Sequence, residues 1–302
     1  MNRSPYGRRG FVLSAGFAGA AAFAGYANDA AAATRVSAGA SATDRKRPSL
    51  VLPPRDNRAM VKLFTSLDGS AAPWWFAGYL YAIQLGQRPI PLVRCLGCEI
   101  YFPQKQPDGS VLARGATLTF FRDVDSGEFL ERLTNPLTGK VNEVKPNVLR
   151  SRGRSGMLYP ADGSAPYIIF GEGSETGQLN YRPPTGESQA RHGELSWEEV
   201  GTRVVVTTSH GVDTPAQPWL EVSTVSGERE ALRDDSRPTM RASGSATYAS
   251  PWLKWLQMDE VPGHLMWHVG SEKLASLDEL PRAYREQAEK TRLIDGLAPP
   301  KD

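Results

Sequence analysis

Hydrophobic and polar positions alternate most regularly between residues 113 and 146, where the sequence predicts three antiparallel strands. In the first strand, one face carries Ala116, Leu118 and Phe120 and the other carries Thr117, Thr119 and Phe121. A period of two in residues that favour extended backbone is typical of a strand with one buried face. A second strand is expected at 129–134 and a third through Val141 and Val144. Together they predict a meander that must bury one face against further strands.

A turn of favourable composition follows each of the first two predicted strands. The first is Asp-Val-Asp-Ser-Gly at 123–127 and the second is Asn-Pro-Leu-Thr-Gly at 135–139. Asp, Asn and Ser side chains accept hydrogen bonds from the local backbone, and Gly127 and Gly139 are expected to supply positive φ. Two roles stay open for Asn135: its side chain caps the turn, or it contacts a ligand at the mouth of a barrel.

Shorter strand-like runs recur along the rest of the chain, each bounded by Gly, Pro, Asp or Ser. Few helical patterns separate them, which predicts an antiparallel sandwich or a closed barrel, and closure is favoured because it leaves no free edge. The expected fold class is all-β: an antiparallel barrel or barrel-like sheet of about eight to ten strands with one C-terminal helix. Ordered structure is expected from 55–67 onward, and the helix from Pro281 to Arg292. The strand-like runs are 72–83, 90–102, 166–170, 177–181, 203–208, 219–224, 244–248 and 264–269.

Residues 1–33 have the features of an export signal. Arg8 and Arg9 are followed by three apolar residues and then by a weakly apolar run rich in Ala and Gly. This is the pattern of a twin-arginine signal peptide that is removed after export. A retained membrane anchor is the alternative, because about 20 apolar residues can span a bilayer. The many small residues, with Asn28 and Asp29 at the end of the run, favour cleavage.

The rest of the chain divides into a disordered leader at 34–54, rich in Ala, Ser and Gly, and a single β-rich domain at 55–302. The protein is expected to be periplasmic or secreted, with the twin-arginine export machinery as a partner and no stable membrane insertion after cleavage. The signal carries three Arg and one Asp, so its removal takes the formal net charge from +2 to zero. Nucleic acid is therefore not expected as a partner, since it binds to clustered basic surfaces.

Cys95 and Cys98 are the only cysteines of the chain. A redox pair places its reactive thiol at a helix N-terminus, whereas the flanking residues here are strand-like. Residues three apart on a regular strand point to opposite faces, so a disulfide would need a bulge at Gly97. A zinc site normally has four ligands, and no second pair exists. A structural role is favoured, with a disulfide in the exported compartment as the next alternative.

Histidines offer the best candidates for acid–base chemistry. His264 and His268 are four apart, which on a strand separates their Cα atoms by about 13 Å and prevents them from sharing a metal. His192 and His210 each precede a Gly in a polar context, where a structural role is the more common one. No Ser lies in a nucleophile elbow and no glycine-rich loop opens a helix. Neither a metal nor a cofactor is expected.

Several short motifs follow one another along the chain in a characteristic order. They are the twin-arginine leader, Trp74-Trp75 with Gly78 to Tyr81, Asn135 to Lys140, Pro251-Trp252-Leu253, Pro262 to His268, and Leu277 to Pro281. In this order they resemble the motifs of the uncharacterised family called domain of unknown function 1838. The resemblance covers nearly all of the chain after the leader, and it implies an exported, β-rich protein without an agreed activity. The Cys95 and Cys98 pair is not a feature associated with that family.

Two classes of function are compatible with these features. The first is a protein that binds a small apolar or aromatic molecule in a barrel mouth, although packing is the commoner role of such aromatic residues. The alternative is a cofactor-independent isomerase, lyase or hydrolase that uses His192, His210 or His268 as acid or base. Convergence of aromatic walls, a His and a carboxylate such as Glu99 or Glu221 would favour the enzyme. The expected ligand contacts are Trp75, Tyr79, Tyr81, Arg94, Glu99, Asn135, Trp252 and Trp267.

Overall fold

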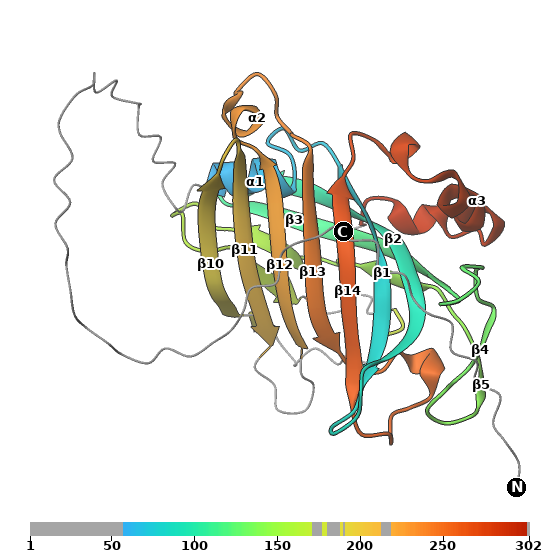
Figure 1. Ribbon diagram of the computed structural model, residues 1–302. Coiled ribbons are helices and arrows are strands. Elements are labelled where there is room, and N and C mark those ends of the chain that lie inside the picture. The colour runs from blue at the N-terminus through green and yellow to red at the C-terminus, as the bar shows by residue number, and fades with distance from the viewer. Residues whose placement is uncertain (1–56, 171–176, 180–187, 190, 213–218, 301–302) are drawn as a thin grey trace, which may run out of the picture. The chain divides into compact units, whose positions relative to one another are not determined.

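The computed structural model describes residues 57–170, 177–179, 188–189, 191–212 and 219–300 (Figure 1). The chain divides into two compact units, Met1–Ser49 and Leu50–Asp302, and the first lies wholly outside the described residues. The sequence-based assignments to 1–33 and 34–54 therefore fall outside the described part. No helix of the described part is long and apolar enough to cross a membrane.

Antiparallel strands form almost all of the described structure, as the alternating sequence pattern predicted. The main sheet has 12 strands in the order β10-β11-β12-β13-β14-β1-β2-β3-β7-β8-β9, with β6 also paired to β3. The strands are β1 (Ala72–Ile83), β2 (Ile90–Lys105), β3 (Val111–Arg122), β6 (Asn147–Arg150), β7 (Gly156–Tyr159), β8 (Tyr167–Phe170), β9 (Ser188–Gln189), β10 (Arg191–Val200), β11 (Arg203–Val212), β12 (Trp219–Glu228), β13 (Ala242–Ser250) and β14 (His264–Lys273).

The sheet curls on itself (Figure 1). The expected fold class, an all-β antiparallel barrel-like sheet with a C-terminal helix, is confirmed. Strand number exceeds the expected eight to ten because four short strands, β6 to β9, extend the sheet beyond β3. Among the described residues no ladder of hydrogen bonds joins the end strands β9 and β10, so the sheet is barrel-like and not closed.

Helices are few and short. α1 (Asn57–Phe64) precedes the first strand, α2 (Arg229–Arg233) follows β12, and α3 (Arg282–Lys290) lies within the helix predicted from Pro281 to Arg292. Three 3-10 helices complete the set in the described part: η1 (Lys254–Leu256), η2 (Leu277–Glu279) and η3 (Ile294–Leu297).

Two hydrophobic clusters occupy the inner face of the curled sheet. Along β1, Trp74 belongs to a cluster that includes α1, whereas Leu80 and Ala82 belong to a second cluster that includes the segment around η1. Because these residues share one face of the same strand, the two clusters lie toward its opposite ends. We call them the α1 cluster and the η1 cluster.

A third cluster covers the outer face of β1, β2 and β3 with the C-terminal segment. Tyr284 of α3 is fully buried there, and its hydroxyl donates to the carbonyl of Leu118 at 2.8 Å. Cys98 belongs to this outer cluster and Cys95 to the η1 cluster inside, and both are free thiols. The prediction that the two thiols point to opposite faces is confirmed. Burial raises the pKa of each thiol to about 12, so neither is a reactive thiolate at neutral pH.

The predicted meander is only partly correct. β4 (Arg132–Thr134) and β5 (Val141–Glu143) form a separate two-stranded sheet, and only the bridge between Arg122 and Phe129 connects the chain after the first turn to β3. The neighbours of β3 are β2, β6 and β7 instead. The hairpin leaves the sheet because its polar side chains bind η1: the Asn142 amide donates to the carbonyl of Leu256 at 3.2 Å.

One further predicted strand, at 177–181, is not present as a strand in the described residues. Leu179 makes an isolated bridge with Leu253, and 180–181 lie outside the described part. The bridge ties this segment to the residue just before η1.

The turn at 135–139 is held by hydrogen bonds of its own backbone and of the Asn135 side chain. Gly139 has φ 70° and its N–H donates to the carbonyl of Asn135 at 2.8 Å. The Asn135 side chain is fully buried, accepts from the N–H of Leu137 at 2.9 Å and donates to the Met258 sulfur at 3.0 Å. Asn135 therefore caps the turn and anchors it to the segment after η1.

We expect Gly139→Val to lower the free energy of unfolding by about 1 to 2 kcal/mol, because a β-branched residue is strained at positive φ. No atom lies within 4 Å of the position that a Cβ would take, so backbone strain alone sets the size of the effect. Urea unfolding measures the change, and Lys140→Val, one residue further on in an exposed position, is the control. Equal midpoints for both variants would contradict the turn's contribution to stability.

Candidate functional site

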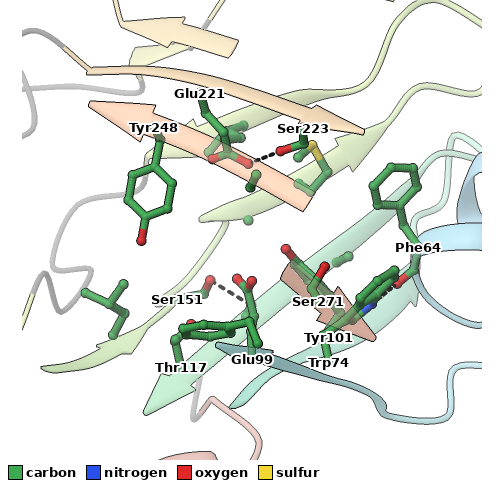
Figure 2. Close-up of a pocket in the computed structure, with 18 of the residues that line it drawn as sticks. Phe64, Trp74, Glu99, Tyr101, Thr117, Ser151, Glu221, Ser223, Tyr248 and Ser271 are labelled. Carbon is green, nitrogen blue, oxygen red and sulfur yellow. Dashed lines mark hydrogen bonds between the residues drawn. The ribbon is translucent and has the colours of Figure 1, made fainter. Parts of the chain in front are cut away.

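A cavity of about 370 Å³ lies on the inner face of the curled sheet between the two inner clusters (Figure 2). Trp74 of the α1 cluster and Val269 of the η1 cluster both line it. The long strands β1, β2, β3, β12, β13 and β14 supply walls, and the short strands β6, β7 and β8 supply further contacts. Its volume lies within the range of about 300–1,000 Å³ that is usual for small-molecule sites.

Aromatic rings form much of the cavity wall, and other contacts hold several of them in place. The indole N–H of Trp74 donates to the carbonyl of Phe64 at 2.8 Å. Tyr248 stacks on Trp267 with ring centroids 5.1 Å apart and an angle of 12° between the planes. Phe76 lies over Gly97, where an added Cβ would approach the ring to 2.3 Å. The rings that line the cavity are those of Phe64, Trp74, Phe76, Tyr101, Tyr159 and Tyr248.

Glu99 of β2 contributes a carboxyl group to this wall. It is half-buried because it faces the cavity, and the hydroxyls of Tyr101 and Thr117 lie near it. Burial, with the nearby charge of Glu221, raises the pKa of Glu99 from 4.5 to about 7. The two hydroxyl donors act in the opposite direction and offset part of that rise. Glu99 is therefore close to half-protonated near neutral pH.

Glu221 of β12 is the second carboxyl group of the cavity. Its Oε1 accepts a hydrogen bond from the Ser223 hydroxyl on the same face of the strand. Figure 2 shows Glu99 and Glu221 directed into the cavity from opposite walls. β12 and β2 are separated in the sheet by β13, β14 and β1, so it is the curl that brings these two carboxyls into one cavity.

Neutral phenol groups complete the polar part of the wall. Burial raises the pKa values of Tyr101, Tyr159 and Tyr248, and the charge of Glu99 acts in the same direction on all three. These hydroxyls therefore keep their protons at physiological pH and can donate hydrogen bonds to a ligand.

Basic side chains contribute little to the described part of this cavity. Among the described lining residues, Arg150 is the single arginine and neither Lys nor His is present. The Arg150 guanidinium donates to the carbonyls of Asp295 and Gly296 in η3. Within the described ranges, no group of three or more His, Cys, Asp or Glu side chains is placed to hold a metal ion.

Of the residues that the sequence singled out as ligand contacts, Glu99 lines the cavity. Trp75, Tyr79 and Tyr81 alternate with the lining residues of β1 and project from its other face. Trp75 packs edge-on against Tyr284 with centroids 5.2 Å apart. The Arg94 guanidinium lies 5.6 Å from the centre of the Tyr79 ring, so these two also meet outside the cavity.

The other expected contacts lie in the η1 cluster and do not line the cavity. The Trp252 indole donates to the carbonyl of Val261 at 2.9 Å. Trp267 is 1% exposed and its indole donates to the Ser250 hydroxyl at 2.8 Å. Trp267 acts on the site indirectly, because Tyr248 stacks against it. The Asn135 side chain makes its hydrogen bonds to Leu137 in the turn and to Met258.

Of the candidate histidines, only the side chain of His268 is described, and it does not line the cavity. His268 is exposed on the outer face, where its Nδ1 is 2.9 Å from the Thr247 hydroxyl. The side chains of His192 and His210 lie outside the described part. Their backbone positions are described: His210 is the Cα partner of His192 on one side and of Glu221 on the other.

Sequence reasoning missed most of the aromatic wall. It favoured Trp75 and Tyr79, which lie on the opposite face of β1 from the lining residues Trp74 and Phe76. A signal was present, since Glu99 is the one carboxylate of its strand, within the apolar run 95–103, and Trp74 is its Cα partner in the register. A carboxylate at that position marks a polar cavity more strongly than a closed core.

Comparisons with protein-family models, with curated proteins and with solved structures find no match to this chain. The resemblance to domain of unknown function 1838 therefore stays a prediction. Fold and site together define a curled antiparallel sheet that encloses a cavity with aromatic walls and two carboxyl groups.

Proposed function

We propose that the protein binds a small organic molecule with an apolar or aromatic body inside the curled sheet. The observation that carries this proposal is the cavity of about 370 Å³ between two packed clusters. The cavity is a partly open hollow on the inner face of the sheet, and a concave, mostly apolar hollow of this size is the usual form of a small-molecule site.

The wall also has the composition of a binding site. Most of the surface is aromatic or aliphatic, and a few hydroxyl and carboxyl groups converge on it from different strands. Trp74 and Tyr248 are held by contacts within the protein, so their rings are positioned before a ligand arrives. Such preorganisation reduces the entropy lost on binding.

Native mass spectrometry tests this proposal on protein purified from the periplasm, where the signal at 1–33 predicts it to be. We expect the wild type to carry a bound compound. Ala246→Phe places a ring into the cavity from β13, beside its register partners Ser223 and Val269, and is expected to lose the compound. Thr247→Phe adds the same ring to the opposite face of the strand and should retain it.

Two results would contradict the proposal. One is a bare mass for the wild type under conditions that preserve weak complexes. The other is equal retention by Ala246→Phe and Thr247→Phe, which would place the compound elsewhere.

A second candidate function is general acid–base catalysis by the two carboxyl groups. The observation in its favour is the pKa of Glu99, which at about 7 suits an acid or base at neutral pH. Glu221 would then be the partner of Glu99. Incubating the retained compound with fresh protein distinguishes the candidates: conversion that is lost in both Glu99→Gln and Glu221→Gln indicates an enzyme, and an unchanged compound indicates binding alone.

A further inference from the structure

The cavity combines two acidic side chains with several ring faces, and the described part of its wall has no basic side chain directed inward. We propose that its ligand is an organic cation, an amine or quaternary ammonium on an apolar or aromatic body, with the positive charge placed between Glu99 and Glu221. This inference rests on the proposed function, because it names the chemical class that the same cavity takes.

Charge balance is the first argument. A carboxylate that leaves water needs a counter-charge or strong hydrogen-bond donors, and two carboxylates in one cavity repel each other. The Arg150 guanidinium is bound to η3 carbonyls. Lys273 is buried beside α1, but its amino group donates to the carbonyls of Lys62, Leu63 and Thr65. Among the described residues, neither group is directed at the carboxyls, so a cationic ligand would supply a counter-charge there.

Ring faces supply the second argument. A cation over the face of Trp or Tyr is attracted by about 0.5–2 kcal/mol, and more when it is shielded from water. Trp74, Tyr101 and Tyr248 line the same cavity as the two carboxyls. Aromatic faces combined with acidic oxygens are the chemistry that recognises ammonium groups, and the same surface repels anions.

The hydroxyl groups around the carboxyls are the third argument. Ser223 donates to Glu221, and the hydroxyls of Tyr101 and Thr117 lie close enough to Glu99 to act on its pKa. These neighbours leave acceptor sites of the carboxyl oxygens open. A protonated amine has the N–H donors that such oxygens need and a quaternary ammonium offers its charge alone, whereas a neutral hydrocarbon offers neither.

Three probes of similar size test the inference: benzyltrimethylammonium, its neutral isostere neopentylbenzene, and the anion phenylacetate. Affinities are measured by calorimetry at pH 8 with protein freed of any bound compound. We expect the cation to bind about tenfold or more tightly than the neutral probe, and the anion not to bind. Glu99→Gln with Glu221→Gln should abolish the preference for the cation and leave the affinity for neopentylbenzene within about twofold.

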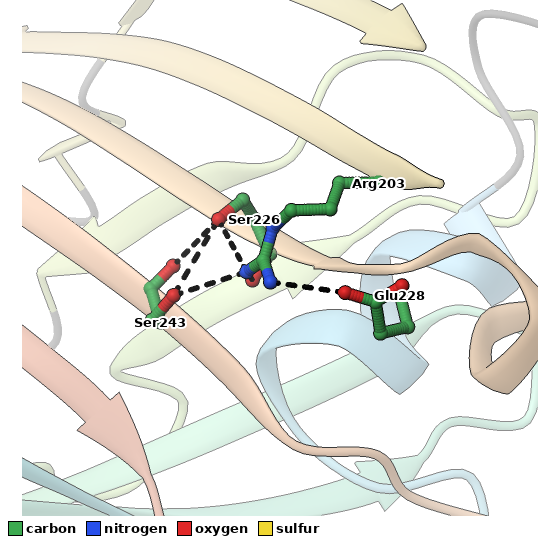
Figure 3. Close-up of polar contacts among 4 residues, drawn as sticks. All are labelled: Arg203, Ser226, Glu228 and Ser243. Carbon is green, nitrogen blue, oxygen red and sulfur yellow. Dashed lines mark hydrogen bonds and ion pairs between the residues drawn. The ribbon is translucent and has the colours of Figure 1, made fainter. Parts of the chain in front are cut away.

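The matched control is Glu228→Gln, which removes one carboxylate outside the cavity. Glu228 is exposed and pairs with Arg203 at 3.1 Å, within a surface network that also includes Ser226 and Ser243 (Figure 3). This variant should bind all three probes as the wild type does. Melting curves confirm that each variant is folded.

The outcomes separate this inference from the proposed function. Equal affinity for the cation and the neutral probe overturns the cation inference and leaves small-molecule binding in place. Tighter binding of the anion overturns the inference as well. If no probe binds and no compound is retained by the purified protein, both the inference and the proposed function fail.

Discussion

Lys273→Met is expected to lower the free energy of unfolding by about 2 to 4 kcal/mol. The amino group of Lys273 is 1% exposed and donates to the carbonyls of Lys62, Leu63 and Thr65 at the end of α1. Carbonyls at a helix C-terminus have no partner within the helix, and each buried one left unpaired costs about 1–3 kcal/mol. Methionine fills a similar volume without offering a donor.

Relief of a buried charge offsets part of this cost. Burial, together with the neighbouring Lys62, lowers the pKa of Lys273 to about 7, so the protonated amino group is itself unfavourable in this place. The carbonyl of Thr65 also accepts from the Thr239 hydroxyl at 3.2 Å, so the substitution removes a donor chiefly from the carbonyls of Lys62 and Leu63. The expected loss is therefore smaller than the sum over these two carbonyls. Lys62 has the same kind of role, since its amino group donates to the carbonyls of Leu232 and Asp234.

Urea unfolding at pH 7 measures the change. Lys290→Met is the control, because the Lys290 side chain is 71% exposed and its ion pair with Glu131 is long, at 4.0 Å. Exposed ion pairs contribute about 0–1 kcal/mol, so this variant should unfold with nearly the wild-type midpoint. A loss below about 1 kcal/mol for Lys273→Met would show that α1 is not anchored by that amino group.

Local features of the fold could be predicted because they depend on neighbouring residues. Alternation located β3, and Gly127 and Gly139 do adopt positive φ at 74° and 70°. The run at 264–269 lies within β14, and Pro281 immediately precedes α3. In each case the backbone preference of a few adjacent residues decides the conformation.

Strand partners could not be predicted in the same way. The hairpin of β4 and β5 was expected beside β3, but Asn135 and Asn142 bind it to the segment at η1, more than a hundred residues further along the chain. β3 then pairs with β6 and β7. Contacts between residues so distant in sequence leave no local pattern.

The candidate site was predicted only in part, and the reason is again physical. Alternation along β1 shows that Trp74 and Trp75 point to opposite faces, but both faces are aromatic. Which face is the inner one depends on α3, whose Tyr284 covers Trp75 from outside. Glu99 was identified because a carboxylate that converges with aromatic walls is the expected chemistry of a pocket.

The pH dependence of stability is the second large effect that we expect. Glu99 has a pKa raised from 4.5 to about 7 in the folded protein. As the pH rises through this window, the unfolded chain releases the proton while the folded chain holds it, so the folded state loses stability. The loss attributable to Glu99 reaches up to about 3 kcal/mol above pH 7. The groups that act on Glu99 there are Glu221, Tyr101 and Thr117, and the neutral phenols of Tyr159 and Tyr248 lie nearby.

Glu99→Gln isolates this contribution, because the amide cannot ionise. We expect the variant to be more stable than the wild type at pH 8 and close to it at pH 4.5, with urea midpoints recorded across that range. Glu228→Gln, which removes an exposed carboxylate, should follow the wild-type curve. Parallel curves for Glu99→Gln and the wild type would contradict a buried, destabilised carboxyl at this position.

Glu99 and Glu221 are placed in one cavity, and an NMR pH titration of the Glu99 carboxyl carbon measures their interaction most directly. Ligand-free wild-type protein is compared with Glu221→Gln, and Glu99→Gln identifies the resonance. We expect the Glu99 carboxyl to titrate with a midpoint of about 7 in the wild type and with a lower midpoint in Glu221→Gln, because the nearby charge has been removed. A midpoint near 4.5 that does not respond to Glu221→Gln would contradict this interaction.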